Sequence, residues 1–314
     1  MNRGDAASPS ATLRALGRVG VWTYQLDLQP APVARETAAE LEELGFASIW
    51  LSDSVRRELF SNASLILNAT KNLSVATGIA NIYSRDALTM AFGQKTIAEA
   101  FPGRFVLGLG VGHRAAVEGL RGHRYDPPIA TMRHYLQSMA MAPYQGPRPS
   151  TGCPTILAAL GPKMIELARD LADGIHPYHT TPEHTKAARQ ILGDEAFLAP
   201  EQSVVFETDP GRARAIARSR LKNTLTQPNY LRNLARLGFS SDDLSGTGSD
   251  YLIDNLVAWG KEEAIAGRIK EHLDAGADHV AVQILVPDDR ALPFRQWRML
   301  ASVLSQFDAP IEGS

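Results

Sequence analysis

Short hydrophobic runs alternate along this chain with longer stretches in which apolar residues recur at the three- and four-residue spacing of a helix. The runs have the length of strands, and several are apolar on successive residues, which is typical of strands covered on both faces. We expect strands at residues 18–22, 47–51, 73–79, 104–110, 154–160, 173–177, 202–207 and 278–285. Eight strands that are each followed by helix predict a parallel (β/α)8 TIM barrel.

Capping and helix-breaking residues mark the ends of several stretches between the strands. Asp86 can cap the helix that follows it, and Gly45 can end the first long helix. We expect helices at residues 32–44, 59–70, 87–100, 128–141, 162–172, 182–192 and 293–307, and a long helical region at 209–275.

The alternation is interrupted twice, and both interruptions predict insertions into the barrel. Residues 113–150 follow the fourth strand, are rich in Gly, Pro and Arg, and contain one expected helix. The long helical region between the seventh and eighth strands is the second insertion. Long insertions after barrel strands are often functional. We expect a single domain over 16–307, a disordered or weakly ordered leader at 1–15 and a frayed tail at 308–314.

Composition and charge narrow the class of protein. The 314 residues include 32 Lys and Arg and 34 Asp and Glu, a net charge of −2, which argues against binding to nucleic acid. No apolar run reaches the ~20 residues of a membrane span. The single cysteine, Cys153, cannot form an internal disulfide. We therefore expect a cytoplasmic protein that binds a small-molecule substrate and neither nucleic acid nor membrane.

In a TIM barrel the active site lies at the carboxyl ends of the strands. The fourth expected strand ends in Gly108-Leu-Gly-Val-Gly-His113, the most glycine-dense strand end of the chain. Glycines let a backbone approach a ligand closely, but their spacing here does not match a dinucleotide-binding fingerprint. A tight turn with close strand packing is the structural alternative. His113, just beyond the glycines, can donate a hydrogen bond or a proton near neutral pH.

The fifth expected strand leads into a helix through Ala158-Ala-Leu-Gly-Pro-Lys163. Free amides at a helix N-terminus attract phosphate. Lys163 adds a positive charge in the first turn, where the helix dipole disfavours a cation, and this indicates an anionic ligand. An ordinary strand-to-helix turn with a solvated lysine is the alternative.

Histidines cluster after the sixth expected strand, in Ile175-His-Pro-Tyr-His179 and at His184. A metal site would need a further ligand that the first strand does not offer, so we predict none. We place His176 in a substrate pocket and His184 on a helix surface. Trp22 and Tyr125 can line the same pocket for a flat ligand.

At these strand ends the sequence resembles the luciferase-like monooxygenase superfamily, and within it the coenzyme F420-dependent oxidoreductases of actinobacterial type. The stretches that carry the resemblance follow the expected order through most of residues 18–285. They are Ala47-Ser-Ile-Trp-Leu-Ser-Asp53, Val75-Ala-Thr-Gly-Ile-Ala-Asn81, Phe101-Pro-Gly-Arg-Phe-Val-Leu-Gly-Leu-Gly-Val-Gly-His113, Leu157-Ala-Ala-Leu-Gly-Pro-Lys-Met164 with Ala172-Asp-Gly174, and Ala275-Gly-Ala-Asp-His-Val280.

The resemblance implies a set of coenzyme-binding residues. Gly78 and Ile79 match a non-proline cis peptide bond that lies against the deazaflavin ring. Asp53 matches an acidic position that contacts the ring system, although a helix cap is its structural alternative. The other positions lie at the fourth strand end and at the phosphate-side turn. They are Val111, Gly112, Ala159, Leu160, Gly161 and Pro162, to which the helix-terminus argument adds Lys163.

The resemblance also implies a reaction and a homodimer. A hydride would pass between C5 of coenzyme F420 and an organic alcohol, carbonyl or activated alkene. His113 stands where related enzymes place a proton donor, often Glu. Ser54 stands where some sugar-phosphate dehydrogenases of this branch carry a catalytic His, so no base is matched.

Three other functions stay open on the sequence. A reduced-FMN monooxygenase would use the same barrel with FMN as the cofactor. A metal-dependent barrel hydrolase would need ligands at the strand ends. A catalytically idle coenzyme-binding or scaffold protein would keep the coenzyme site without turnover.

Overall fold

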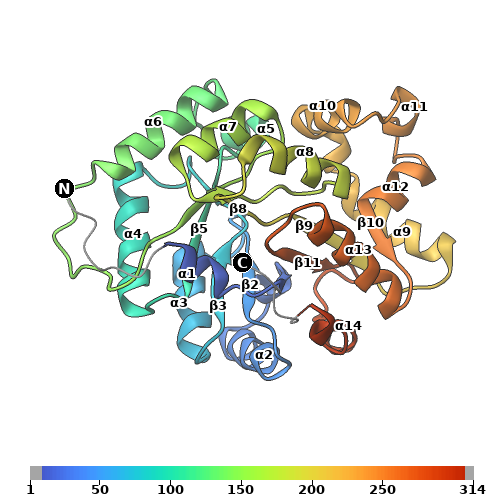
Figure 1. The fold of residues 1–314 in the computed structure, drawn as a ribbon, viewed down its shortest axis with the longest axis horizontal. Helices are drawn as coiled ribbons and strands as arrows, with labels where there is room; N and C mark the ends of the chain where they lie inside the picture. Colours follow the sequence, from blue (N-terminus) through green and yellow to red (C-terminus); the bar gives the residue numbers. More distant parts are fainter. Residues whose placement is uncertain (1–8, 308–314) are drawn as a thin grey trace.

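Parallel strands form one sheet that curls around the centre of the molecule, with helices on its outside (Figure 1). This computed structural model describes residues 9–307. The strands are β1 (Val19–Trp22), β2 (Ser48–Leu51), β3 (Ser74–Thr77), β4 (Ala80–Asn81), β5 (Phe105–Gly110), β6 (Thr155–Leu157), β7 (Gly174–Ile175), β8 (Phe197–Leu198), β9 (Glu201–Val205), β10 (Val257–Trp259) and β11 (Val280–Ile284). The α-helices are α1 (Pro9–Arg14), α2 (Ala31–Glu43), α3 (Leu59–Ala69), α4 (Ala87–Ala100), α5 (Arg114–Gly119), α6 (Pro128–Ala140), α7 (Pro162–Leu171), α8 (Pro182–Leu192), α9 (Pro210–Leu221), α10 (Pro228–Arg236), α11 (Ser241–Leu244), α12 (Asp250–Leu256), α13 (Glu262–Asp274) and α14 (Phe294–Ala301).

Two short strands together close the ring. β8 pairs with β7, β9 pairs with β11, and only Ala199 and Pro200 separate β8 from β9. The Ala199 N–H donates to the Ile175 carbonyl at 3.0 Å, and the Ala281 N–H donates to the Pro200 carbonyl at 2.9 Å. The path from β8 through β9 therefore forms one barrel strand with a neighbour on each side. Counted in this way, eight parallel strands surround the axis, and the predicted TIM barrel is confirmed.

Most expected elements occur within a few residues of their predicted bounds. The Asp86 cap is confirmed, because its carboxylate accepts a hydrogen bond from the Thr89 N–H at 2.9 Å. The insertion at 113–150 holds two helices, α5 and α6, where we expected one. α5 is too short to show a helical period in the sequence. No helix within residues 9–307 is long and apolar enough to cross a membrane.

β10 lies inside the region expected to be helical throughout, at 209–275. Its residues follow directly after α12 and pair in parallel with β9. β10 is a three-residue apolar run that directly follows a helix. Such a run is too short to show the alternation of a strand, so the sequence pattern could not distinguish β10 from the end of α12.

The expected leader at 1–15 ends earlier than predicted. Residues 9–14 form α1, and Leu13 and Leu16 are buried against the inside of the barrel. The Ser48 hydroxyl donates to the Leu16 carbonyl at 2.9 Å. Long-range packing at the amino-terminal end of the strands thus orders a segment whose own sequence gives no such signal. Residues 1–8 of the leader and the tail at 308–314 lie outside the described residues.

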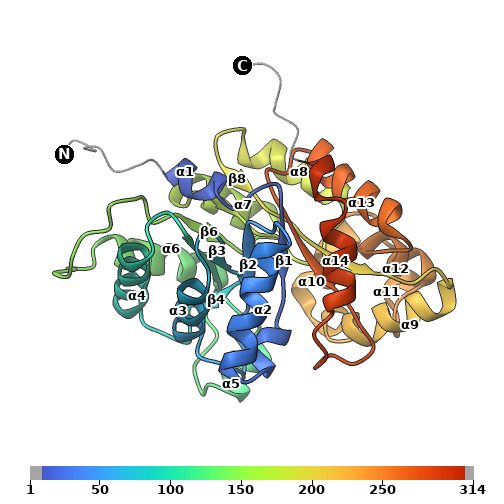
Figure 2. The same ribbon diagram turned by 90° about the horizontal axis from the view of Figure 1, so that it is seen from below.

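The insertion between β9 and β11 has an apolar core of its own. Leu221 of α9, Leu234 of α10 and Leu256 of α12 are fully buried in one cluster, separate from the cluster inside the barrel. Figure 2 shows these helices grouped along one flank of the ring. Their positions are therefore fixed by packing within the insertion as well as by contact with the barrel.

A buried carboxyl group lies in the barrel wall. Glu201 is fully buried and accepts hydrogen bonds from the His179 N–H at 3.0 Å and the Ser203 hydroxyl at 2.6 Å. Burial raises the pKa of Glu201 to about 7 in spite of these two bonds. The carboxyl group ties the loop after β7 to β9.

We expect Glu201 to make stability depend on pH. Its pKa in the folded chain, about 7, exceeds the ordinary value of 4.5, so its stabilising contribution is complete below about pH 4.5 and is lost as the pH rises to about 7. From about pH 5 to pH 8, the free energy of unfolding of the native chain should fall by roughly 2–3 kcal/mol relative to that of Glu201→Gln. Urea unfolding of both proteins measures this difference, and a difference that stays constant with pH would contradict it.

Glycines let β5 pack closely against β3 and β4. A Cβ atom at Gly108 would overlap the Thr77 carbonyl oxygen, and one at Gly110 would overlap the Ile79 side chain. The Thr77 hydroxyl also bridges the N–H and carbonyl of Gly108, at 2.8 Å each. Close strand packing, the structural alternative for this motif, therefore accounts for both glycines.

Replacing Gly108 with Ala should lower the free energy of unfolding by about 1–3 kcal/mol, because the backbone of β3 has to move. Gly119→Ala is the matched control, since nothing lies within 4 Å of its Cβ position. Urea unfolding compares the two variants. Equal stability of both would show that the close approach of β5 and β3 is unimportant.

Candidate active site

A cis peptide bond between Gly78 and Ile79 interrupts the third barrel strand. The resemblance implied a non-proline cis bond at this place, and the bond is present. β3 ends before it and β4 resumes after it. The Gly78 N–H donates to the Leu51 carbonyl at 2.7 Å, and the Asp53 N–H donates to the Ile79 carbonyl at 3.2 Å. The cis bond is therefore held beside the carboxyl end of β2.

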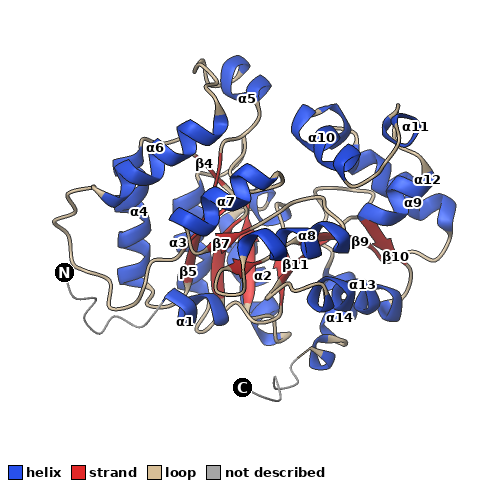
Figure 3. Ribbon diagram, turned by 45° about the horizontal axis from the view of Figure 1, so that its top comes forward, coloured by secondary structure: helices blue, strands red, loops and turns tan. Residues whose placement is uncertain are grey.

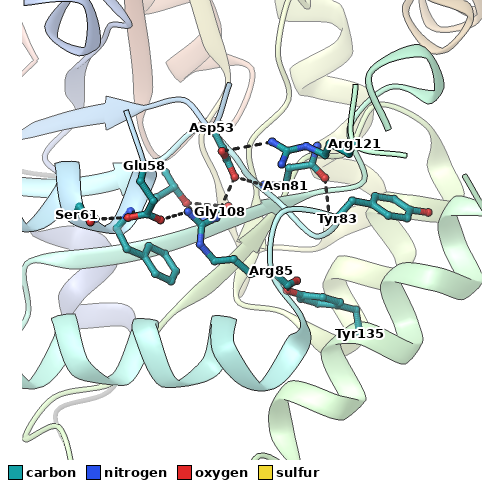
Figure 4. Close-up of polar contacts among 11 residues, drawn as sticks. Asp53, Glu58, Ser61, Asn81, Tyr83, Arg85, Gly108, Arg121 and Tyr135 are labelled. Carbon is teal, nitrogen blue, oxygen red and sulfur yellow. Dashed lines mark hydrogen bonds and ion pairs between the residues drawn. The ribbon is translucent and has the colours of Figure 1, made fainter. Parts of the chain in front are cut away.

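Asp53 lies in a network of arginines beside this bond (Figure 4). Its side chain is only 7% exposed and accepts hydrogen bonds from the Asn81 N–H at 3.1 Å and from Arg85 at 3.0 Å. Arg121, from the insertion after β5, approaches the second carboxylate oxygen at 3.8 Å. Arg85 also pairs with Glu58. Asp53 thus joins the cis segment to the insertion, and its predicted contact with a coenzyme stays a prediction.

Two buried nitrogen atoms face Gly78 from inside the barrel. A Cβ atom on Gly78 would overlap Nε1 of Trp22 and would lie 2.9 Å from Nε2 of His176. Neither nitrogen has a hydrogen-bond partner among the described residues. Nδ1 of His176 lies 2.7 Å from the Ala199 carbonyl, so Nδ1 donates and Nε2 is the bare side of a neutral ring. Burial lowers the pKa of His176 to about 4, which keeps the ring neutral.

Tyr125 lies in a different group from these two predicted pocket residues. Its ring stacks on Tyr83 at 5.9 Å, and its hydroxyl donates to the Gly112 carbonyl at 3.4 Å. The Asp126 N–H donates to the Tyr83 hydroxyl at 3.2 Å. Tyr125 therefore fastens the insertion at 113–150 to the end of β5.

His113 lies at the edge of the barrel mouth and faces α10. Its ring is 5.8 Å from that of Tyr230, and its side chain is hydrogen-bonded to Asn229. Burial lowers the pKa of His113, although the bond to Asn229 opposes this effect. Val111 and Gly112 precede it, and Gly112 has a positive φ of 61° that favours glycine. Figure 3 shows α5, which begins after His113, at the same end of the molecule as α10.

The predicted phosphate-side turn leads from β6 into α7. Gly161 is the N-cap of α7, and no side chain caps the helix amides. Ala159 is buried, Leu160 and Gly161 are half-buried, and Pro162 and Lys163 are exposed. Nε2 of His184 lies 2.9 Å from the Leu160 carbonyl and fixes the turn. His184 is buried, so the prediction that it lies on a helix surface is wrong.

Sequence reasoning missed an aromatic wall at the mouth of the barrel. Tyr178 packs 5.2 Å from Trp22 and 3.9 Å from His179, whose ring is 6.0 Å from Tyr230. The Tyr178 hydroxyl donates to Gln283 at 2.7 Å. The cluster of histidines at residues 176–179 was the sequence signal that could have indicated this wall. We considered that cluster only as a metal site or pocket residue, whereas His179 packs between Tyr178 and Tyr230. Within residues 9–307, no group of three or more His, Cys, Asp or Glu side chains could hold a metal ion.

The chain is similar in sequence to known reductases. The model of the luciferase-like monooxygenase family matches residues 13–279. The 5,10-methylenetetrahydromethanopterin reductase of Archaeoglobus fulgidus is 23% identical over 295 residues, which cover 79% of this chain and 88% of that protein. The reductase of the same name from Methanolobus tindarius is 26% identical over 173 residues, or 49% of this chain, and the match spans about half of that protein (53%).

Solved structures share the fold. An F420-dependent secondary alcohol dehydrogenase, in complex with an F420-acetone adduct, has a TM-score of 0.71 at 16% identity, over 93% of this chain and 99% of that one. The FMN-bound oxygenating component of 3,6-diketocamphane monooxygenase from Pseudomonas putida, a type II Baeyer-Villiger enzyme, has a TM-score of 0.70 at 13% identity, over 92% of this chain and 97% of that one. The family match spans most of the barrel, and the chain belongs to the luciferase-like monooxygenase family.

Proposed function

We propose that the chain is an F420-dependent oxidoreductase that transfers a hydride between the coenzyme and an alcohol, a carbonyl compound or an activated alkene. The observation that carries the proposal is a luciferase-like barrel in which two buried nitrogen atoms without partners among the described residues, Nε1 of Trp22 and Nε2 of His176, face Gly78. One structural neighbour with this fold is an F420-dependent alcohol dehydrogenase.

The described residues fit a flat ring that is joined to a phosphate. In the first turn of α7, Pro162 has no N–H and the Met164 N–H donates to the Gly161 carbonyl at 3.0 Å, which leaves the Lys163 amide for a ligand. Two cationic side chains, Lys163 and Arg236, have no ion-pair partner among the described residues. The bound coenzyme would accept or donate the hydride at its ring. Gly78 and Ile79 would support the ring, and the turn at Gly161 would hold the phosphate. Trp22 and His176 face Gly78 from inside the barrel.

His113 is the residue that we assign to the proton. Its lowered pKa keeps the imidazole neutral near pH 7. The N–H of the neutral ring can donate a hydrogen bond to a carbonyl oxygen, and its bare nitrogen can accept the proton that an alcohol releases on oxidation. Tyr230 of α10 lies beside the ring, 5.8 Å away. The arrangement supplies orientation and proton transfer, while the coenzyme supplies the redox chemistry.

A reduced-FMN monooxygenase is the second candidate, and the FMN-bound neighbour with the same fold favours it. A reduced flavin reacts readily with oxygen, whereas a reduced 5-deazaflavin does not. The two candidates therefore differ in the cofactor that binds and in whether oxygen is consumed.

The purified chain should bind F420 with a dissociation constant of about 10 μM or below, and more tightly than FMN. Fluorescence titration with both cofactors measures this preference. A dissociation constant for F420 above about 1 mM would exclude the proposal. FMN binding about tenfold tighter than F420, together with oxygen consumption, would favour the second candidate instead.

His113→Ala should lower kcat by about 10²- to 10³-fold, because the hydrogen bond to the reacting oxygen is lost, and should leave the dissociation constant for F420 within about threefold. His134→Ala, an exposed position on α6, is the control and should keep full activity. Steady-state kinetics with a substrate found by screening tests this. Unchanged turnover in His113→Ala would remove His113 from the mechanism.

The assembly and the cellular compartment are also part of the proposal. We expect a homodimer, because luciferase-like barrels are commonly paired, and a cytoplasmic location. Sedimentation equilibrium and cell fractionation test these two expectations.

A further inference from the structure

α10 presents a polar face to the mouth of the barrel. Asn229, Asn233 and Arg236 are separated by four and three residues, so they lie on one side of the helix. Asn229 is hydrogen-bonded to His113 beyond β5. Arg236 reaches the turn after β6, where its guanidinium would lie 3.6 Å from a Cβ atom on Gly161. This face therefore extends between two strand ends that we assign to the active site.

The other side of α10 is fixed by apolar packing. Leu234 is fully buried in the core of the insertion, and Leu231 and Leu237 pack partly against the same core. The hydrophobic contacts set the rotation of the helix. The polar face of the helix is thus held toward the barrel mouth, with Asn233 buried and the Arg236 side chain exposed.

Two groups on this face lack a suitable partner. Arg236 donates to Oδ1 of Asn233 at 3.1 Å and has no ion-pair partner among the described residues. Asn233 is 2% exposed, and its Nδ2 has no hydrogen-bond partner in the described part of the chain. A buried amide donor without an acceptor is costly, and the cation beside it has no counter-charge. The Arg236 guanidinium stands next to the first turn of α7, which has no side-chain cap.

We propose that Asn233 and Arg236 of α10 bind the phosphate of the coenzyme side chain together with the first turn of α7. The inference rests on the proposed function and adds residues from the second insertion to the coenzyme site. A guanidinium forms paired, charge-assisted hydrogen bonds to phosphate oxygens, and the Asn233 amide supplies a further donor. F420 and FMN both carry a phosphate, so Asn233 and Arg236 would serve either cofactor.

The test measures binding and does not need turnover. The full chain and Arg236→Ala are titrated by fluorescence with F420 and FMN, and with their phosphate-free counterparts, the deazaflavin riboside analogue and riboflavin. Loss of Arg236 should raise the dissociation constant of the preferred phosphorylated cofactor by about 10- to 100-fold. It should leave the dissociation constant of the phosphate-free counterpart within about twofold of that of the native chain.

Lys222→Ala is the matched control, because it removes an exposed positive charge from the same insertion at the end of α9. It should leave both dissociation constants unchanged. Thermal unfolding checks that each variant is folded, and Arg236→Gln, which keeps most of the side-chain length, replaces Arg236→Ala if that variant is unstable.

The outcomes distinguish a wrong proposed function from a wrong role for α10. If the native chain binds neither the phosphorylated cofactors nor their phosphate-free counterparts, the proposed function is wrong. If it binds a phosphorylated cofactor and the Arg236 variant binds it equally well, the inference about α10 is overturned while the function stands. Equal weakening of the phosphorylated and phosphate-free forms would likewise overturn it.

Discussion

The close contact between β5 and the broken strand β3–β4 is the constraint on which the site depends. Only residues without a side chain allow it, because Thr77 and Ile79 occupy the space that a Cβ atom at Gly108 or Gly110 would need. The contact holds Ile79 against β5, and hydrogen bonds from Gly78 to Leu51 and from Asp53 to Ile79 hold the other edge. The cis bond is thereby enclosed on both sides by barrel strands.

The barrel could be predicted from the sequence because it depends on local spacing, whereas several features of the site depend on distant contacts. The alternation of apolar runs and helical stretches is enough to predict eight parallel strands. The glycine motif was noticed, but its reason lies in Thr77 and Ile79, about thirty residues earlier in the chain. α1 is ordered by packing of Leu13 and Leu16, which no local signal reveals.

The candidate site likewise combines features that the sequence predicts with features that depend on distant contacts. Its strand-end residues were found because the fold places strand ends together, and the resemblance named the cis bond. Sequence reasoning could not place Tyr230 and Arg236 there, since α10 belongs to an insertion whose direction is set by its own core. Nor could it foresee that Asp53 is occupied by Arg85 and Arg121, because those arginines come from two different loops.

The separate apolar cluster of the second insertion has a consequence for how the site can change. Leu221, Leu234 and Leu256 share their cluster with Val205 of β9, so substitutions among these leucines would shift α10 on the outer face of that strand. The barrel and the helix that covers its mouth can therefore diverge at different rates. A family that keeps one scaffold could change its ligand preference by re-aiming such a module, with the catalytic strand ends left intact.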